Sequence, residues 1–198
     1  MLSMERNLLP DTYADIFSMA QHNAPPLSGP LIVKTFKQYM QHTPQELFDE
    51  FDMQAAYAAS IGQVHRAVKN GRQLAVKIQY PGVADSVKSD LKLVKPFALR
   101  LLNMKEKDVR IFFDEVENKL LEETDYELEL QRSVSISQKC NQLENLSFAR
   151  YYPELSSKRI LTMDWLNGVH LTDFINSNPS RELRNQIGQA LWDFYSFQ

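Results

Sequence analysis

The chain has 198 residues, of which 43% are apolar, 24% charged and 11% aromatic. This composition can bury the core of one ordinary domain, or of two small lobes that share a core, and it shows no signature of disorder. The formal charge of -3 gives no electrostatic footprint for nucleic acid and no polybasic tract for anionic lipid. Cys140 is the only cysteine, which excludes a disulfide framework and a cysteine zinc site.

Targeting and membrane-spanning segments are not apparent. The start, MLSMERNLLP, contains Glu5 and lacks an apolar core of signal-peptide length. No later stretch stays uncharged for the length of a bilayer. We therefore expect a soluble protein of a reducing compartment.

The first part of the chain is predicted to be helical. In LLPDTYADIFSMAQ, Pro10 stands at a helix start and apolar residues follow at the spacing of one helix face. A second helix is predicted from Pro30 to Met40. HTPQELFDEF then contains a capping box, with Thr43 as N-cap and Glu46 three residues later.

From Asp52 the pattern changes to strands. The pair Asn70-Gly71 between VHRAV and QLAVKIQ predicts a hairpin, because these residues adopt the positive φ angles of its turn. Side chains alternate along a strand, so the second strand has two faces. One face takes Leu74, Val76 and Ile78, and the other takes Ala75, Lys77 and Gln79.

The remainder alternates between helix and strand. Helices are predicted over 85–102 and, bent near Thr124, over 108–141. Strands are predicted near 147–152 and 159–165, and a last helix covers 181–198. Helices around a small antiparallel sheet indicate an α+β lobe with a helical extension.

Lys77 is the first candidate for chemistry. It lies mid-strand with Ala75 beside it, so its ammonium faces a surface open to a flat ligand, which suits a phosphate-binding lysine. A strand lysine more often simply faces water. The preceding AASIGQV has short side chains, so its backbone N–H groups can approach phosphate oxygens, although close strand packing also favours such a run. Walker and dinucleotide motifs are absent from the sequence.

A positioned lysine usually needs a carboxylate partner. The acid-rich stretch KLLEETDYELELQ offers several, and Asp125 and Glu129 are four apart and share a helix face. Most acidic helices are simply solvated, so spacing alone does not choose among them. The candidates are Glu122, Glu123, Asp125, Glu127 and Glu129.

These stretches together resemble the UbiB/AarF family of atypical protein-kinase-like proteins. Its alanine-rich loop, A-A-A-S-[IL]-[GA]-Q-V-H, is matched by YAASIGQVH, in which Tyr57 replaces the first alanine. LAVKIQYPGV is similar to the family's lysine strand, and EETDYELE to its E-x-D motif with the glutamate of helix C. RILTMDWLNGVHLTDF resembles the strand and hinge that hold adenine.

The resemblance implies an α+β fold with a protein-kinase-like N-lobe, in which a small antiparallel sheet is joined by helix C. Family-specific helices precede this lobe and the start of a helical C-lobe follows it. The implied segments are an N-terminal helical extension at 1–48, the N-lobe at 49–168 and a truncated C-lobe start at 169–198.

The resemblance also implies a site. Lys77 would bind the α- and β-phosphates of ATP and form an ion pair with Glu129. Glu123 and Asp125 would form the regulatory E-x-D motif. The implied nucleotide-binding residues are Ala58, Ala59, Ser60, Ile61, Gly62, Gln63, Ala75, Lys77, Met163 as gatekeeper, and Asp164, Trp165 and Leu166 as hinge.

The implied function is the ATP-binding lobe of an atypical kinase or ATPase that supports ubiquinone (coenzyme Q) or isoprenoid-lipid biosynthesis, with ATP and Mg²⁺ as cofactors. The implied partners of the whole protein are ubiquinone-biosynthesis proteins and membrane lipid, without nucleic acid. The implied location is cytoplasmic or peripheral to the inner membrane, mitochondrial in a eukaryote. The alternative is a non-catalytic, pseudokinase-like scaffold for a lipid-biosynthesis partner.

Three family motifs have no counterpart in the sequence: K-x-G-Q, the H-x-D-x-H-x-G-N catalytic loop and a D-F-G-type magnesium site. Asp193 and Phe194 lack the following glycine and come too early. We therefore expect a phosphate clamp without catalytic base or metal ligands, inactive by itself, in a partial family member. The four histidines show no ligand spacing and are interpreted as structural or surface residues.

Overall fold

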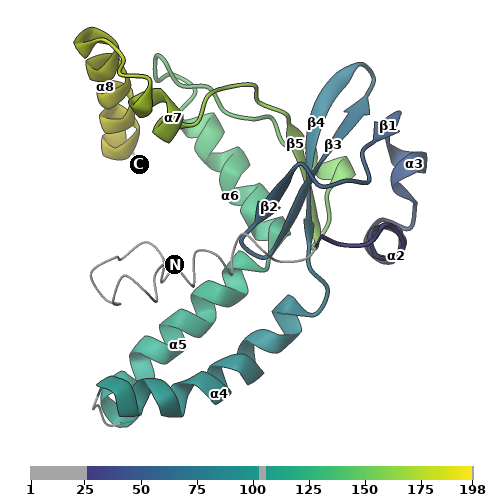
Figure 1. The fold of residues 1–198 in the computed structure, drawn as a ribbon, viewed down its shortest axis with the longest axis vertical. Coiled ribbons are helices and arrows are strands. Elements are labelled where there is room, and N and C mark those ends of the chain that lie inside the picture. Colours follow the sequence, from purple (N-terminus) through teal and green to yellow (C-terminus); the bar gives the residue numbers. More distant parts are fainter. Residues whose placement is uncertain (1–25, 103–105, 198) are drawn as a thin grey trace.

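The computed structural model describes residues 26–102 and 106–197 (Figure 1). The helix predicted to start at Pro10 lies outside these residues. The helices are α2 (Gly29–Met40), α3 (Pro44–Leu47), α4 (Val83–Leu102), α5 (Glu106–Glu123), α6 (Tyr126–Lys139), the 3-10 turn η1 (Pro153–Leu155), α7 (Leu171–Asn176) and α8 (Arg181–Phe197). The strands are β1 (Glu50–Phe51), β2 (Tyr57–Ala59), β3 (Gly62–Lys69), β4 (Arg72–Gln79) and β5 (Ile160–Asp164).

The strands form one antiparallel sheet in the order β1-β3-β4-β5, with β2 also paired to β3. The predicted hairpin between β3 and β4 is confirmed: Lys69 pairs with Arg72, and the turn residues Asn70 and Gly71 have φ angles of 51° and 73°. Both angles are positive, as the tight hairpin turn requires. The resulting register positions the residues of the candidate site discussed below.

One face of the sheet forms the core. Leu74, Val76 and Ile78 of β4 are at most 1% exposed, as their alternation predicted. They pack with Ile32 and Phe36 of α2 in a single hydrophobic cluster. Burying side chains of this size stabilises a fold by about 1.5–3 kcal/mol each. Helix α2 therefore shares one core with the sheet.

The short helix α3 begins as its capping box predicts. The Glu46 carboxylate accepts a hydrogen bond from the Thr43 backbone N–H at 2.6 Å. The helix predicted to start at Pro30 is also present, since α2 covers Gly29–Met40. These two helices lie on one side of the sheet, while α6 passes on the other side (Figure 1).

The predicted bend near Thr124 is a full break between two helices. Helix α5 ends at Glu123 and α6 begins at Tyr126. Helices α4 and α5 lie side by side and extend away from the sheet, whereas α6 contacts β5 (Figure 1). Within the described ranges, no helix is both long and apolar enough to cross a bilayer.

The predicted strand near 147–152 is wrong. Only an isolated bridge joins Tyr151 to Met163 there. The Arg150 N–H is bonded to the Asp164 side chain at 3.1 Å, and Pro153 starts a 3-10 turn directly afterwards. Side-chain bonding and the proline end the ladder before a strand can form. The following strand, β5, is present and ends at Asp164.

A buried hydrogen-bond chain on the core face involves His65. Its Nδ1 lies 2.8 Å from the Asp52 carbonyl, to which it must donate, so the neutral ring has Nε2 as acceptor. The Gln63 amide nitrogen lies 2.6 Å from this Nε2. Burial lowers the pKa of His65 below its ordinary 6.5. Protonation of Nε2 would also place its N–H against the Gln63 amide N–H, so that two donors would face each other and the hydrogen bond would be lost.

This arrangement predicts acid sensitivity. Because the folded pKa is the lower one, the unfolded chain binds the proton first, so stability is lost as pH falls through about 6.5. The loss attributable to His65 should reach at most about 1.4 kcal/mol per pH unit. The free energy of unfolding, measured with urea at several pH values between 7.5 and 5.5, should fall less steeply with decreasing pH for His65→Asn than for the wild type. His42→Asn, at an exposed position, is the control, and equal slopes for wild type and His65→Asn would contradict the assignment.

Candidate functional site

The sheet face opposite the core presents the candidate site. Directly opposed residues of antiparallel strands point to the same face, so the register defines rows of neighbours. One row holds Tyr57, Val64, Lys77 and Leu161, and the next holds Arg66, Ala75 and Met163. The alanine-rich hairpin lies at the end of this face.

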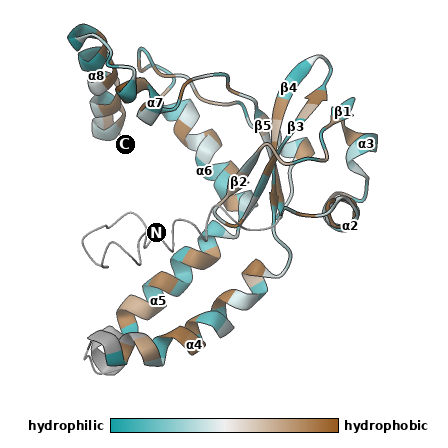
Figure 2. Cartoon of the chain, in the orientation of Figure 1, coloured by the Kyte–Doolittle hydropathy of each residue, from teal (hydrophilic) through white to brown (hydrophobic). Residues whose placement is uncertain are grey.

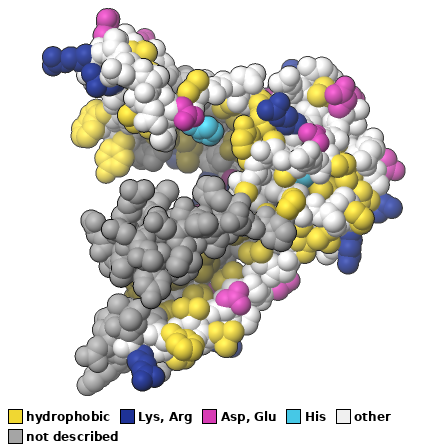
Figure 3. Space-filling view, viewed as in Figure 1, with side chains coloured by type: hydrophobic (Ala, Val, Ile, Leu, Met, Phe, Trp, Pro, Cys, Tyr) yellow, Lys and Arg dark blue, Asp and Glu magenta, His cyan; other side chains and the backbone are white. Residues whose placement is uncertain are grey.

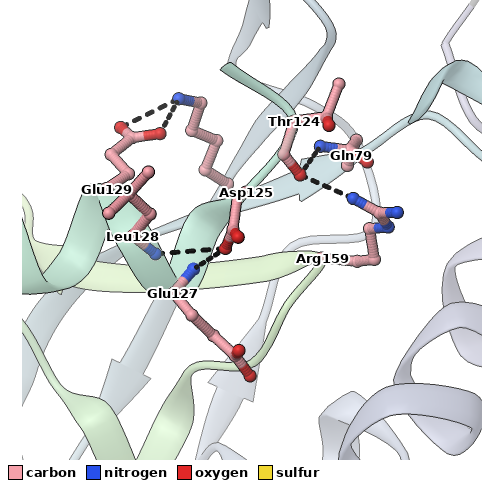
Figure 4. Close-up of polar contacts among 8 residues, drawn as sticks. Gln79, Thr124, Asp125, Glu127, Leu128, Glu129 and Arg159 are labelled. Carbon is pink, nitrogen blue, oxygen red and sulfur yellow. Dashed lines mark hydrogen bonds and ion pairs between the residues drawn. The ribbon is translucent and has the colours of Figure 1, made fainter. Parts of the chain in front are cut away.

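Lys77 and Glu129 form the predicted ion pair. The lysine Nζ lies 3.0 Å from Oε1 and 2.9 Å from Oε2 of the carboxylate (Figure 4). The two side chains are 18% and 35% exposed, so the pair is partly shielded from water. The structure thus selects Glu129 from the acids of its segment.

Tyr126 lies beneath the lysine. Its ring is fully buried, and the Lys77 Nζ stands 4.6 Å from the ring centroid, a cation-π distance. Its hydroxyl has no hydrogen-bond partner among the described residues. Burial, and next the Glu129 charge, raise the pKa of Tyr126, so the phenol stays neutral. An uncharged aromatic floor therefore holds the ammonium in place.

The E-x-D residues stand at the joint between α5 and α6. The Asp125 carboxylate caps α6 by accepting from the backbone N–H groups of Glu127 and Leu128, both at 3.1 Å (Figure 4). Glu123, the last residue of α5, is exposed. Asp125 thus starts the helix that carries Glu129.

The joint is also tied to the sheet. The Thr124 carbonyl accepts from the side chains of Gln79 on β4, at 3.0 Å, and Arg159 (Figure 4). Gln79 and Thr124 are buried. Since Gln79 is two residues from Lys77, these bonds set the distance between α6 and the lysine strand.

The alanine-rich segment is a tight hairpin rather than an open loop. Ala59 pairs with Gly62, leaving only Ser60 and Ile61 in the turn. The Ile61 carbonyl accepts from the Tyr80 N–H at 2.9 Å. A Cβ at Gly62 would lie 2.2 Å from the Ile78 carbonyl oxygen, so this glycine lets β3 and β4 approach closely here. Ala58 and Ser60 are exposed, which leaves this backbone accessible.

Gln63 was predicted among the nucleotide residues, but its side chain lies on the opposite face. It is 1% exposed, and its Oε1 accepts from the Leu27 N–H at 2.8 Å. Its register partner is Ile78, a core residue. Ile78 follows Lys77 directly and therefore points to the opposite face of the sheet, and Gln63, its partner on β3, points to that same face. The side chain of Gln63 thus supports the core, and only its backbone borders the site.

The hinge residues are placed at the end of β5. Met163 faces Ala75 across the strands. The Asp164 carboxylate accepts from the Tyr152 hydroxyl at 2.7 Å, and the Trp165 N–H donates to the Gln73 carbonyl at 3.0 Å. Leu166 is 59% exposed. The side chain of Asp164 is therefore engaged within the lobe.

Sequence reasoning missed Arg66 and the partner of Tyr57. The Tyr57 ring stacks on Trp165 with centroids 5.7 Å apart, and the Arg66 guanidinium carbon lies 4.3 Å from the Trp165 ring centroid. Alternation along β3 could have placed Arg66 on the face of Val64. The contact to Trp165 joins residues far apart in the sequence and had no local signal.

Metal ligands do not gather in the part of the chain that the structure describes. No three His, Cys, Asp or Glu side chains come together there in a way that could hold an ion.

A lysine on a sheet strand, paired with a glutamate of the next packed helix and flanked by a hairpin of short side chains, defines a protein-kinase-like N-lobe. The family model described as "ABC1 atypical kinase-like domain" matches residues 19–198. The chain therefore belongs to the ABC1 family, to which the UbiB/AarF resemblance pointed.

Curated relatives agree with this assignment. The chain is 29% identical to Protein ACTIVITY OF BC1 COMPLEX KINASE 8, chloroplastic, of Arabidopsis thaliana, over 96% of this chain and 26% of that protein. It is 30% identical to Probable serine/threonine-protein kinase abkA of Dictyostelium discoideum, over 94% and 35%. It is 28% identical to Probable protein kinase UbiB of Haemophilus ducreyi, over 87% and 34%. The chain thus spans about a third or less of the length of these relatives.

A solved structure also resembles the chain. The complex of Rv3197 with erythromycin from Mycobacterium tuberculosis matches with a TM-score of 0.69 and 27% identity, over 94% of this chain and 48% of that one. The fold prediction, an α+β kinase-like N-lobe, is confirmed by this match and by the family assignment.

The cap of α6 yields a stability prediction. Asp125→Ala removes the acceptor of two backbone N–H groups and should lower the free energy of unfolding by about 1 kcal/mol. Asp125→Asn should restore most of it, because asparagine also caps. Urea unfolding measures both, with Asp90→Ala at an exposed site in α4 as the control. A loss equal to that of the control would contradict the capping role.

Proposed function

We propose that the chain is the ATP-binding lobe of an atypical kinase or ATPase of the UbiB/AarF type. The observation that carries this proposal is the ion pair between Lys77 and Glu129 on the face opposite the core. In the kinase template the same pair holds the lysine against the α- and β-phosphates. The residues fit this role, because the ammonium is only partly exposed and lies close to a hairpin with accessible backbone.

We assign different residues to the phosphates and to the base of the nucleotide. Lys77 takes the phosphates, with Glu129 as its positioning partner, while the backbone of residues 58–63 covers them. Ala75 leaves depth for the base beside Met163 and the hinge at 164–166. We assign Glu123 and Asp125 a regulatory role at the joint that places α6. Mg²⁺, when bound, would neutralise phosphate charge, and we place its ligands outside the residues that the structure describes.

At the level of the whole protein, we propose a role in ubiquinone or isoprenoid-lipid biosynthesis. The relative named UbiB in Haemophilus ducreyi supports this role. The proposed partners are biosynthesis proteins and membrane lipid, and the proposed location is the cytoplasm or the surface of the inner membrane, mitochondrial in a eukaryote. Within the chain we propose the division into an extension at 1–48, an N-lobe at 49–168 and a C-lobe start at 169–198.

A second candidate function is a non-catalytic scaffold for a lipid-biosynthesis partner. It is favoured by α4 and α5, whose apolar segments reach the surface (Figures 2 and 3). The large apolar side chains exposed on these two helices include Leu93, Val94, Phe97, Ile111 and Phe112. Apolar patches of this kind mark contact surfaces.

Lys77→Met tests the leading proposal. At a concentration 100-fold above Kd, a ligand adds about 2.7 kcal/mol to the folded state. For a chain of this size each kcal/mol raises Tm by about 2–4 °C. Saturating Mg-ATP should therefore raise the wild-type Tm by about 5–10 °C and leave Lys77→Met nearly unchanged, as measured by differential scanning fluorimetry.

Lys88→Met is the matched control, because Lys88 also pairs with a glutamate but is 67% exposed on α4. It should keep the full ATP-dependent rise. An equal rise in Lys77→Met would remove the lysine from the site. A wild type that shows no rise with ATP would support the scaffold instead.

A further inference from the structure

Tyr57, Trp165 and Arg66 form a cluster on the nucleotide face that the ion pair does not explain. The Tyr57 and Trp165 rings are nearly parallel, at 17°, with centroids 5.7 Å apart. The Arg66 guanidinium carbon stands 4.3 Å from the centroid of Trp165. We call the two rings the Tyr57–Trp165 stack.

The stack spans the sheet face on which the proposed function places the base. Tyr57 belongs to β2 and Trp165 follows β5, with β3 and β4 between them. Neighbouring strands are about 4.8 Å apart, so the outer two are separated by roughly 14 Å. The rings can meet only by leaning towards each other across the middle strands. The row between them there is that of Arg66 and Ala75.

The two rings are held unequally. Trp165 is half-buried, and its backbone N–H donates to the Gln73 carbonyl at 3.0 Å. Tyr57 is 53% exposed and stands on a three-residue strand whose only sheet neighbour is β3. Tyr57 is therefore the ring that can move, while Trp165 stays in place.

We propose that Trp165 is the stacking platform for a purine base, and that Tyr57 occupies the position of the base when no nucleotide is bound. This inference rests on the proposed function. A planar base stacks on an indole as the phenol does here, and the guanidinium of Arg66 adds a cation to the same ring. A two-ring purine covers more of the indole than a pyrimidine, so the platform favours ATP over CTP.

The two halves of the stack should respond to truncation in opposite directions. Tyr57→Ala removes the competitor of the base and should tighten ATP binding by about three- to tenfold. Trp165→Leu removes the platform and should weaken ATP binding by at least about fivefold, with a smaller effect on CTP. Calorimetric titration of the 198-residue chain with each nucleotide measures both constants.

Conservative variants distinguish a lost base contact from a misfolded chain. Trp165→Tyr keeps an aromatic platform and should retain most of the affinity, and Tyr57→Phe keeps the competing ring and should match the wild type. Trp192 is the only other tryptophan, is 63% exposed and lies on α8, so Trp192→Phe should leave ATP binding unchanged. In that background, Tyr57→Ala should alter the emission of Trp165 before any nucleotide is added.

The outcomes separate this inference from the proposed function. A wild type that binds ATP while Tyr57→Ala binds it equally or more weakly overturns the inference alone. Equal losses for ATP and CTP in Trp165→Leu also overturn it, because a base platform must discriminate. A wild type that binds neither nucleotide contradicts the proposed function and the inference together.

Discussion

The ion pair between Lys77 and Glu129 is the constraint on which the rest of the site depends, because its members come from different elements. Lys77 is fixed by the ladder of β4, and Glu129 is carried by α6. Bringing their polar atoms to 2.9 Å requires α6 to begin at a defined point. The Asp125 cap fixes where α6 begins, and the hydrogen bond from Gln79 to the Thr124 carbonyl holds this start of the helix against the sheet.

The sheet separates stability from chemistry by alternation. Residues of β4 at even positions from Leu74 to Ile78 fill the core with α2, and those between them face the site. Gln63 and His65 belong to the core face, where their hydrogen bond is shielded from water and burial lowers the pKa of the imidazole, which favours its neutral form. The same strands can therefore carry the core on one face and the candidate site on the other.

Several features were predictable because their causes are local. The Asn70-Gly71 turn, the capping box at Thr43 and the alternation of β4 each depend on neighbours within a few residues. The strand near 147–152 was not predictable in this way. The Arg150 N–H bonds the Asp164 side chain, 14 positions away, instead of a strand carbonyl, and this tertiary contact overrides local strand propensity.

The sequence by itself determined most of the helices and strands, the core face of the lysine strand and, through its motifs, the family. Only the tertiary structure brought the Glu129 carboxylate within hydrogen-bond distance of Lys77 and stacked the Tyr57 ring on Trp165. Lys77 and Glu129 are separated by 52 positions, and Tyr57 on β2 and Trp165 after β5 come from opposite sides of the sheet. Such contacts depend on how whole elements pack, and periodicity within one element carries no information about its partner.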